Sequence, residues 1–150
     1  NLMIRKISTD ELKSCAEFSE LLQEYAAECP PKDKKPYFYN EELYKTLESN
    51  GLLRVFGAFE DDKLIGFVTV LVTVLPKYTS LVASTESFFV SKPYRTTLAG
   101  MKLLYAAENE AIESGAFGML VSTPHDGPLS KILPKVGYDL NDVVFFKELQ

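Results

Sequence analysis

Residues 86–104 read ESFFVSKPYRTTLAGMKLL, and this stretch decides the fold. Its apolar start, which ends at Val90, is typical of a β-strand. The next residues, Ser91–Arg95, contain the proline and the basic side chains of a short loop. A helix is predicted to begin near Thr97, because small and apolar residues then recur at helical spacing: Gly100, Leu103, Leu104, Ala107 and Ala111. The apolar run Phe117–Ser122 completes a βαβ unit, which predicts two parallel strands and a right-handed crossover.

Outward from this unit, the sequence predicts an α/β fold with a mixed sheet and helices on both of its faces. Ser8 and Glu11 have the spacing of a capping box, so a helix is predicted from there to about Cys29. Further helices are predicted over Asn40–Ser49 and Leu129–Val136, and the helix that begins near Thr97 ends at Ser114. Strands are predicted over Leu2–Ile7, Leu53–Phe59, Leu64–Leu75, Ser80–Val90, Phe117–Ser122 and Val143–Leu149. At this length we expect a single domain over residues 1–150.

Composition excludes several classes of protein. The 150 residues include 21 acidic and 16 basic side chains, for a formal net charge of −5. A nucleic-acid-binding surface is normally basic, so we expect no nucleic-acid partner. The most apolar run, Leu64–Leu75, falls short of the roughly 20 residues of a membrane-spanning helix. The first residues lack the apolar core of a signal peptide, so we expect neither a membrane partner nor export.

The cysteines and the histidine indicate the compartment and the metal content. Cys15 and Cys29 fall on one predicted helix, about 21 Å apart. A disulfide needs Cα atoms within about 7 Å, so these two residues cannot pair with each other. We therefore expect reduced thiols and a cytoplasmic location. His125 is the one histidine in the sequence. Without a cysteine pair at ligand spacing, no metal site is expected.

The start of the predicted helix near Thr97 has the properties of an anion site. The first backbone N–H groups of a helix have no internal partner, and the helix dipole favours negative charge there. Basic residues surround this end, at Lys92, Arg95 and Lys102, whereas acidic residues occupy the second half, at Glu108, Glu110 and Glu113. A bound anion would explain a helix charged against its own dipole. The alternative is a solvated helix start with incidental lysines.

The same stretch resembles the acetyl-CoA motif of the GNAT N-acetyltransferase superfamily. That motif is Arg/Gln-x-x-Gly-x-Gly/Ala after a strand that ends in valine, and here it reads Arg95-Thr96-Thr97-Leu98-Ala99-Gly100. The predicted element order and the Gly137-Tyr138 pair after the last helix also match. The resemblance covers nearly the whole chain. It implies a mostly antiparallel sheet, acetyl-CoA as co-substrate, a small-molecule or protein amine as acceptor, and allows a homodimer.

By this resemblance, two groups of residues bind the cofactor. The end of the strand pairs its backbone with the pantetheine amides through Phe88, Phe89 and Val90. The loop and helix start hold the pyrophosphate through main-chain N–H groups of Arg95, Thr96, Thr97, Leu98, Ala99, Gly100 and Met101. Leu98 departs from the family's usual glycine and adds bulk beside the ligand.

The resemblance also implies the chemistry. Glu86, four residues before Val90, stands where the family often has a catalytic glutamate that takes the proton of the attacking amine. The alternative is a buried or edge carboxylate that pairs with a lysine. His125 is a secondary catalytic candidate, because its usual pKa lies near neutrality. The family's usual tyrosine acid and cofactor-binding asparagine are replaced by Leu133 and Asp126, with Tyr94 and Tyr138 as other candidate acids.

The sequence therefore predicts an N-acetyltransferase in which the amine attacks directly in a ternary complex. The acceptor is left open among polyamines and other amino compounds, protein N-termini or lysines, and aminoglycosides. An aromatic cluster around the first two helices would either shape a pocket for a cation or belong to the core; it comprises Tyr25, Tyr37, Phe38, Tyr39 and Tyr44. The alternative function is a binding or interaction protein that has kept the GNAT fold and lost catalysis.

Overall fold

A computed structural model describes residues 1–28 and 39–150. Within these residues, five strands form one sheet, in the order β1-β2-β3-β4-β5. The strands are β1 (Leu2–Ile7), β2 (Leu53–Glu60), β3 (Lys63–Leu75), β4 (Ser80–Val90) and β5 (Gly118–Leu120). The helices are α1 (Thr9–Ser14), α2 (Phe18–Glu28), α3 (Glu41–Ser49), α4 (Ala99–Glu113) and α5 (Pro128–Ile132), with 3-10 turns η1 (Lys92–Tyr94) and η2 (Leu133–Val136). The predicted end of the first helix at Cys29, and also Tyr37 and Phe38, lie outside the described residues.

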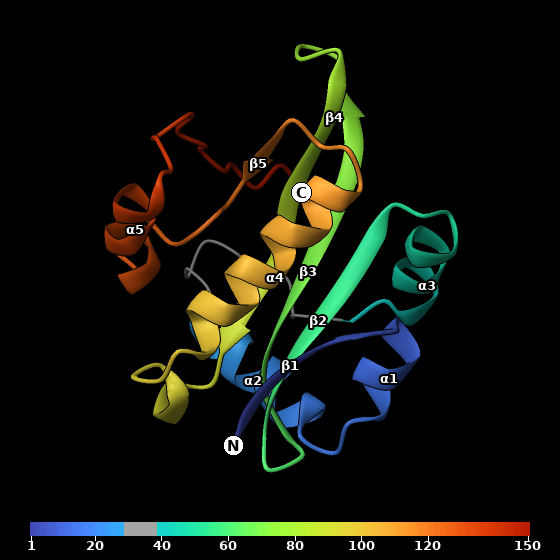
Figure 1. Ribbon diagram of the computed structural model, residues 1–150, viewed down its shortest axis with the longest axis vertical. Coiled ribbons are helices and arrows are strands. Elements are labelled where there is room, and N and C mark those ends of the chain that lie inside the picture. Colours follow the sequence, from blue (N-terminus) through green and yellow to red (C-terminus); the bar gives the residue numbers. More distant parts are fainter. Residues whose placement is uncertain (29–38) are drawn as a thin grey trace.

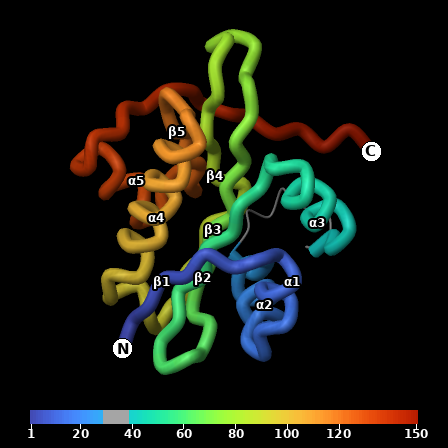
Figure 2. Tube along the Cα trace, turned by 45° about the vertical axis from the view of Figure 1, so that its right-hand side comes forward, coloured from blue at the N-terminus to red at the C-terminus, as the bar shows by residue number. Residues whose placement is uncertain are grey.

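The sheet is mixed, as predicted. The first three strand pairs are antiparallel, and β4 and β5 are parallel. Helix α4 covers one face of the sheet, and α1, α2 and α3 lie on the other (Figures 1 and 2). The core is correspondingly divided in two. Leu103 and Ala107 of α4 pack against one face, and Leu12 and Phe18 pack with Phe67 on the other. These contacts confirm the predicted α/β fold and the βαβ unit.

Strand β4 contains a β-bulge at Glu86. Thr85 lies opposite Val70 of β3 and Ser87 lies opposite Thr69, so Glu86 is an extra residue without a partner. The bulge changes which residues face α4. Leu81 and Ala83 pack toward α4 before the bulge, whereas Phe88 and Val90 do so after it. Glu86 therefore lies at the point where the residues that face α4 change from odd-numbered to even-numbered positions.

The predicted helix that starts at the capping box is two helices. Ser8 does cap α1, because its hydroxyl accepts the Glu11 N–H at 3.0 Å and its own N–H donates to the Glu11 carboxylate at 3.3 Å. The helix then stops, since Cys15 has an extended conformation with ψ of 129°. The Glu17 carboxylate in the break accepts the N–H of Leu64 in the sheet at 2.9 Å. A tertiary contact therefore accompanies an interruption that the helical spacing does not indicate.

Several other elements differ from the predictions. Helix α4 begins at Ala99, two residues after Thr97, and β5 is shorter than Phe117–Ser122. The helix predicted over Leu129–Val136 is α5 followed by the 3-10 turn η2, which ends at Gly137 with φ of 97°. The strand predicted over Val143–Leu149 is wrong, because this segment has no regular structure and does not join the sheet. Its apolar side chains are exposed, including Phe145 at 90%.

Candidate functional site

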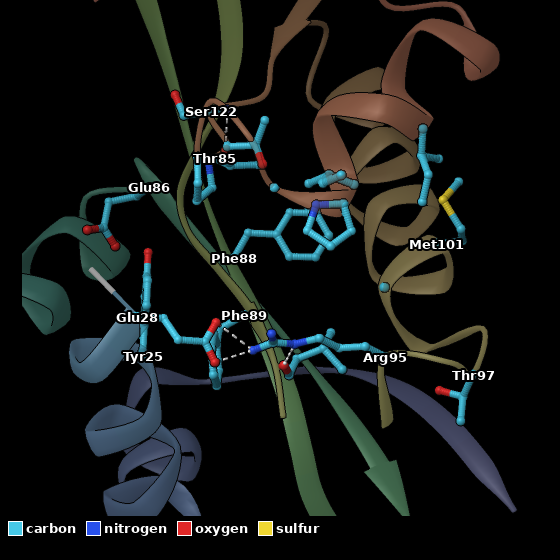
Figure 3. Close-up of a pocket in the computed structure, with 18 residues that line it drawn as sticks. Tyr25, Glu28, Thr85, Glu86, Phe88, Phe89, Arg95, Thr97, Met101 and Ser122 are labelled. Atoms are coloured by element: carbon cyan, nitrogen blue, oxygen red, sulfur yellow. Dashed lines mark hydrogen bonds and ion pairs between the residues drawn. The ribbon is translucent and has the colours of Figure 1, made fainter. Parts of the chain in front are cut away.

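A cleft opens where β4 and β5 stop pairing. Their ladder ends with Ser84 opposite Leu120, and beyond it the N–H of Ser122 donates to the Thr85 hydroxyl at 3.1 Å. The cleft has a volume of about 470 Å³. Its walls come from α2, the second half of β4, the start of α4, the segment after β5, and α5 (Figure 3). The parallel pair thus separates at the end where ligand-binding loops of α/β sheets usually lie.

The first turn of α4 forms one wall of this cleft. Gly100 and Met101 both line it, and they lie in the helix turn whose N–H groups have no helical acceptor. The first internal bond of the helix joins the Lys102 N–H to the Leu98 carbonyl at 2.9 Å. A Cβ built on Gly100 would have one neighbour within 4 Å, the side chain of Val90 at 4.0 Å. The wall therefore contains the first-turn backbone of α4, with open space beside the Cα atom of Gly100.

The predicted cofactor residues separate into two groups. Phe88, Phe89, Val90, Arg95, Thr97, Gly100 and Met101 line the cleft. Thr96, Leu98 and Ala99 are not among the lining residues. The Leu98 side chain is 63% exposed, so it does not block the cleft. Ala99, the first residue of α4, is fully buried and packs in the core between this helix and the sheet.

Arg95 is held by protein groups. Its Nε donates to the Val90 carbonyl at 2.7 Å, and its terminal nitrogen donates to the Glu28 carboxylate at 2.8 Å. The guanidinium also lies over the Phe89 ring, 5.1 Å from its centre. Figure 3 shows this bridge from the loop to α2 across β4. Arg95 therefore ties α2 to the loop that precedes α4, and its charge is balanced by Glu28.

The acidic half of α4 also has partners in the protein. The Glu110 carboxylate is 12% exposed and pairs with Lys6 at 3.0 Å and with Arg54 at 3.2 Å. The Glu108 carboxylate accepts the Tyr138 hydroxyl at 2.6 Å. Contacts with the sheet and with the segment after η2 therefore account for two acidic residues that oppose the helix dipole, without a bound anion.

Glu86 lies on the opposite side of β4 from Phe88, and both line the cleft (Figure 3). The Glu86 Oε1 atom accepts three hydroxyl groups: Tyr44 at 2.6 Å, Ser87 at 2.7 Å and Thr69 at 2.8 Å. Among the described residues, no ion pair involves Glu86, so the predicted alternative of a lysine-paired carboxylate is not found there. This side of the cleft presents a carboxylate surrounded by hydroxyl groups.

The other predicted acid–base residues lie outside the cleft wall. His125 is exposed and is not a lining residue, although its neighbour Pro124 is. Burial and the hydrogen bond to Glu108 raise the pKa of the Tyr138 hydroxyl, which stays protonated and points to α4. Leu133, at the position of the family's tyrosine, is 7% exposed and belongs to the core.

The aromatic side chains near α2 and α3 are mostly packed on one another. Tyr25 stacks on Phe89 with ring centres 5.1 Å apart, and it lines the cleft. Tyr39 stacks on Tyr44 at 4.7 Å and meets Phe18 edge-on at 5.0 Å. Burial raises the pKa of Tyr39 to about 12. The cluster therefore serves mainly as core, and Tyr25 connects it to the cleft.

Several lining residues were not predicted. Glu28 reaches the cleft through Arg95, while the remaining wall is made after β5 by Ser122, Thr123, Pro124, Gly127, Pro128, Leu129 and Ile132. The Gly127-Pro128 pair marks a loop before α5 in the sequence. The sequence does not indicate that this loop lies beside β4 in the cleft. Its position is set by the helix α4, which connects β4 to β5.

The sheet of this α/β protein opens beside the N-terminus of its crossover helix, which is where α/β proteins commonly bind their ligands. A model of the acetyltransferase (GNAT) family matches residues 17–128, and the chain belongs to this family. No curated protein sequence matches the chain at a significant level.

Solved structures share the fold over the full length. A ribosomal-protein-alanine N-acetyltransferase from Brucella melitensis is 16% identical with a TM-score of 0.73, and each chain is covered over 100%. An aminoglycoside acetyltransferase from an uncultured soil metagenomic sample, in complex with trehalose, is 21% identical with a TM-score of 0.75, covering 99% of this chain and 97% of that one. Glucosamine-6-phosphate N-acetyltransferase from Arabidopsis thaliana is 14% identical with a TM-score of 0.75, covering 100% and 99%.

No helix within residues 1–28 and 39–150 is long and apolar enough to cross a membrane. The same residues contain no group of three or more histidine, cysteine or acidic side chains arranged to hold a metal ion.

Proposed function

We propose that the protein is an N-acetyltransferase, formed by a single domain over residues 1–150, that moves an acetyl group from acetyl-CoA to a primary amine. The amine attacks directly while both substrates are bound. One observation carries the proposal: a single cleft has the bare amides of the α4 start on one side of β4 and the Glu86 carboxylate on the other. A donor and an acceptor can therefore meet at the same strand.

The residues present fit acetyl-CoA. The first-turn amides of α4, at Gly100 and Met101, suit a diphosphate, and open space lies in front of Gly100. The backbone of Phe88–Val90 lies where β4 has lost its neighbour β5, so this edge of the strand has no strand partner and can receive amide groups of an extended ligand, except at the Val90 carbonyl, which accepts Arg95 Nε. Acetyl-CoA would supply the acetyl group as an activated thioester. We assign no phosphate contact to the Arg95 side chain, because it is already paired with Glu28.

Glu86 is the proposed general base. A primary alkyl amine is mostly protonated near neutral pH, and only its neutral form is a nucleophile. The proton leaves the amine nitrogen and forms an O–H bond on the Glu86 carboxylate, directly or through a water molecule. We propose no side chain as the acid for the departing thiol, since Tyr138 donates to Glu108 and Leu133 is apolar. A thiolate can take its proton from water.

The acceptor is proposed as a small molecule or a protein amine. The structural neighbours named above act on a ribosomal protein, an aminoglycoside and glucosamine 6-phosphate, which are all different acceptors. The Glu86 carboxylate at the cleft, which has no ion-pair partner among the described residues, favours a cationic acceptor. A cytoplasmic location, where reduced thiols persist, and a homodimer are further proposals.

The alternative proposal is a GNAT-fold binding protein without catalysis. One observation favours it: the family's tyrosine position is the buried Leu133, and none of the tyrosines considered as substitutes lines the cleft. Such a protein would still bind acetyl-CoA in the same cleft, so binding alone does not separate the two functions.

Two measurements test the proposals in sequence. Calorimetry should detect acetyl-CoA binding. The absence of binding at millimolar acetyl-CoA would refute both the enzyme and the binding-protein proposals. Thiol release is then followed over a panel of amines that contains polyamines, aminoglycosides, and peptides with free N-termini or lysines. Glu86→Gln should lower kcat by about 100-fold or more, the usual contribution of a general base. Glu42→Gln, the same chemical change on an exposed α3 residue, is the matched control. Binding without turnover would favour the alternative.

A further inference from the structure

The Glu86 carboxylate is oriented by hydroxyl groups from separate parts of the chain. Tyr44 comes from α3 and Thr69 from β3, while Ser87 is the next residue of β4. All three donate to the same oxygen, Oε1, at 2.6–2.8 Å. Hydroxyl donors to a carboxylate are among the strong hydrogen bonds of proteins. Within the described residues, the other oxygen, Oε2, accepts no hydrogen bond.

Two of these donors are themselves held in place. The Thr69 side chain is 2% exposed, and its hydroxyl also accepts the N–H of Ser87 at 2.9 Å. The Tyr44 ring stacks on Tyr39, with an angle of 19° between the rings. The hydroxyl positions are therefore set by the buried sheet and by an aromatic stack on α3. An exposed glutamate without such partners is free to change its rotamer.

Resting on the proposed function, we propose that Tyr44 is a positioning residue, which holds Oε1 of Glu86 so that Oε2 faces the acceptor amine. In the transfer step, the nitrogen–hydrogen bond of the amine breaks and the proton forms a bond to Oε2. Oε1 keeps its donors throughout, and the proton later passes to solvent. The orientation of a catalytic side chain affects the rate more than it affects the binding of either substrate.

The test compares two neighbouring tyrosines. Tyr44→Phe removes a donor to Glu86, whereas Tyr39→Phe changes the other ring of the same stack, whose hydroxyl has no hydrogen-bond partner within residues 1–28 and 39–150. We expect Tyr44→Phe to lower kcat about tenfold, with the KM for the amine and the Kd for acetyl-CoA within about twofold of the parent. Tyr39→Phe should leave kcat unchanged.

A double-mutant cycle distinguishes positioning from a general structural effect. In the Glu86→Gln background, Tyr44→Phe should cause no further loss of kcat, because the two residues act through one carboxylate. Equal losses in both backgrounds, or a Tyr44→Phe enzyme with the parent kcat, would overturn the inference. A Glu86→Gln enzyme as active as the parent would instead overturn the proposed function.

A readout without turnover covers the case in which no amine of the panel reacts. Crystal structures of the parent and of Tyr39→Phe should show one Glu86 rotamer, and that of Tyr44→Phe should show several. A single unchanged rotamer in Tyr44→Phe would refute the positioning role.

Discussion

Gly100 provides a test in which protein stability and ligand binding are expected to change in opposite directions. It is the second residue of α4, and an added side chain would meet little beyond Val90 at 4.0 Å. Gly100→Glu should therefore fold. It replaces glycine in a helix, a gain of up to about 1 kcal/mol, and places a carboxylate near the helix N-terminus, a further gain of about 0.3–1 kcal/mol.

The same carboxylate should prevent acetyl-CoA binding. A negative charge about 5 Å from a phosphate charge costs about 3 kcal/mol at an effective dielectric constant of 20. The added side chain also fills space in the cleft that Gly100 lines. We expect a loss of affinity of at least 100-fold, since 1.4 kcal/mol corresponds to about tenfold.

The assay pairs calorimetry of acetyl-CoA binding with thermal unfolding of the same samples. Gly100→Ala is the control for side-chain bulk, and it should bind acetyl-CoA more tightly than Gly100→Glu. A Gly100→Glu protein that binds like the parent would refute the assignment of the α4 start as the pyrophosphate site. A lowered melting temperature would show that the loss of binding reflects misfolding.

Three other predictions concern the core and the departures from the family motif. Leu98→Gly should change acetyl-CoA affinity by less than about threefold in calorimetry, because the Leu98 side chain is 63% exposed and lies off the cleft wall; a large gain would instead mean that this leucine obstructs the ligand. Phe67→Ala should lower the free energy of unfolding in urea by about 3–5 kcal/mol, because Phe67 is 2% exposed among other rings. Tyr39→Phe should be neutral or stabilising at pH 7, because the hydroxyl it removes is buried without a partner among the residues that the structure describes. Since burial raises the folded-state pKa of Tyr39 from 10.0 to about 12, the unfolded chain ionises first, and the stability of the parent falls as the pH rises from 10 toward 12. The parent should therefore lose more stability than Tyr39→Phe over that range.

Local signals predicted the helix and sheet elements well where the chain determines its own conformation. The Ser8 capping box and the βαβ unit through α4 depend on residues close in sequence, and both are confirmed. The break between α1 and α2 is different, because Cys15-Ala16-Glu17 contains neither glycine nor proline. Glu17 accepts a hydrogen bond from Leu64, which is distant in sequence. The helical spacing of the neighbouring residues therefore does not indicate this contact or the break that it accompanies.

The segment Val143–Leu149 shows the limit of strand prediction. Its valines and phenylalanines favour an extended chain, but a strand also needs a partner for its backbone. In the structure the segment makes no ladder, and its start is held near the β3–β4 turn by Asp142, which pairs with Lys77 at 3.4 Å. Residue preferences alone do not specify whether a sheet edge lies close enough for the segment to pair with it.

At the candidate site, the sequence motif located the cleft but did not specify what each side chain does. Gly100 and Met101 line the cleft, as the motif implies. The motif does not indicate that Arg95 is paired with Glu28, or that Leu98 is exposed and does not line the cleft. The Arg95 pair depends on the position of α2, which no residue of the motif encodes.

The bulge in β4 makes deleting Glu86 a different change from replacing it. A substitution keeps the length of the strand, so Phe88 and Val90 still face α4. A deletion would remove the bulge, because Thr85 and Ser87 already lie opposite the adjacent residues Val70 and Thr69, and regular alternation would then keep Phe88 and Val90 on the side of α4. Phe89 would still pack with Tyr25. The deletion would instead remove the position from which a carboxylate reaches the hydroxyl groups of Thr69 and Tyr44. A homologue one residue shorter here would therefore keep the same two layers and lose the bulged carboxylate.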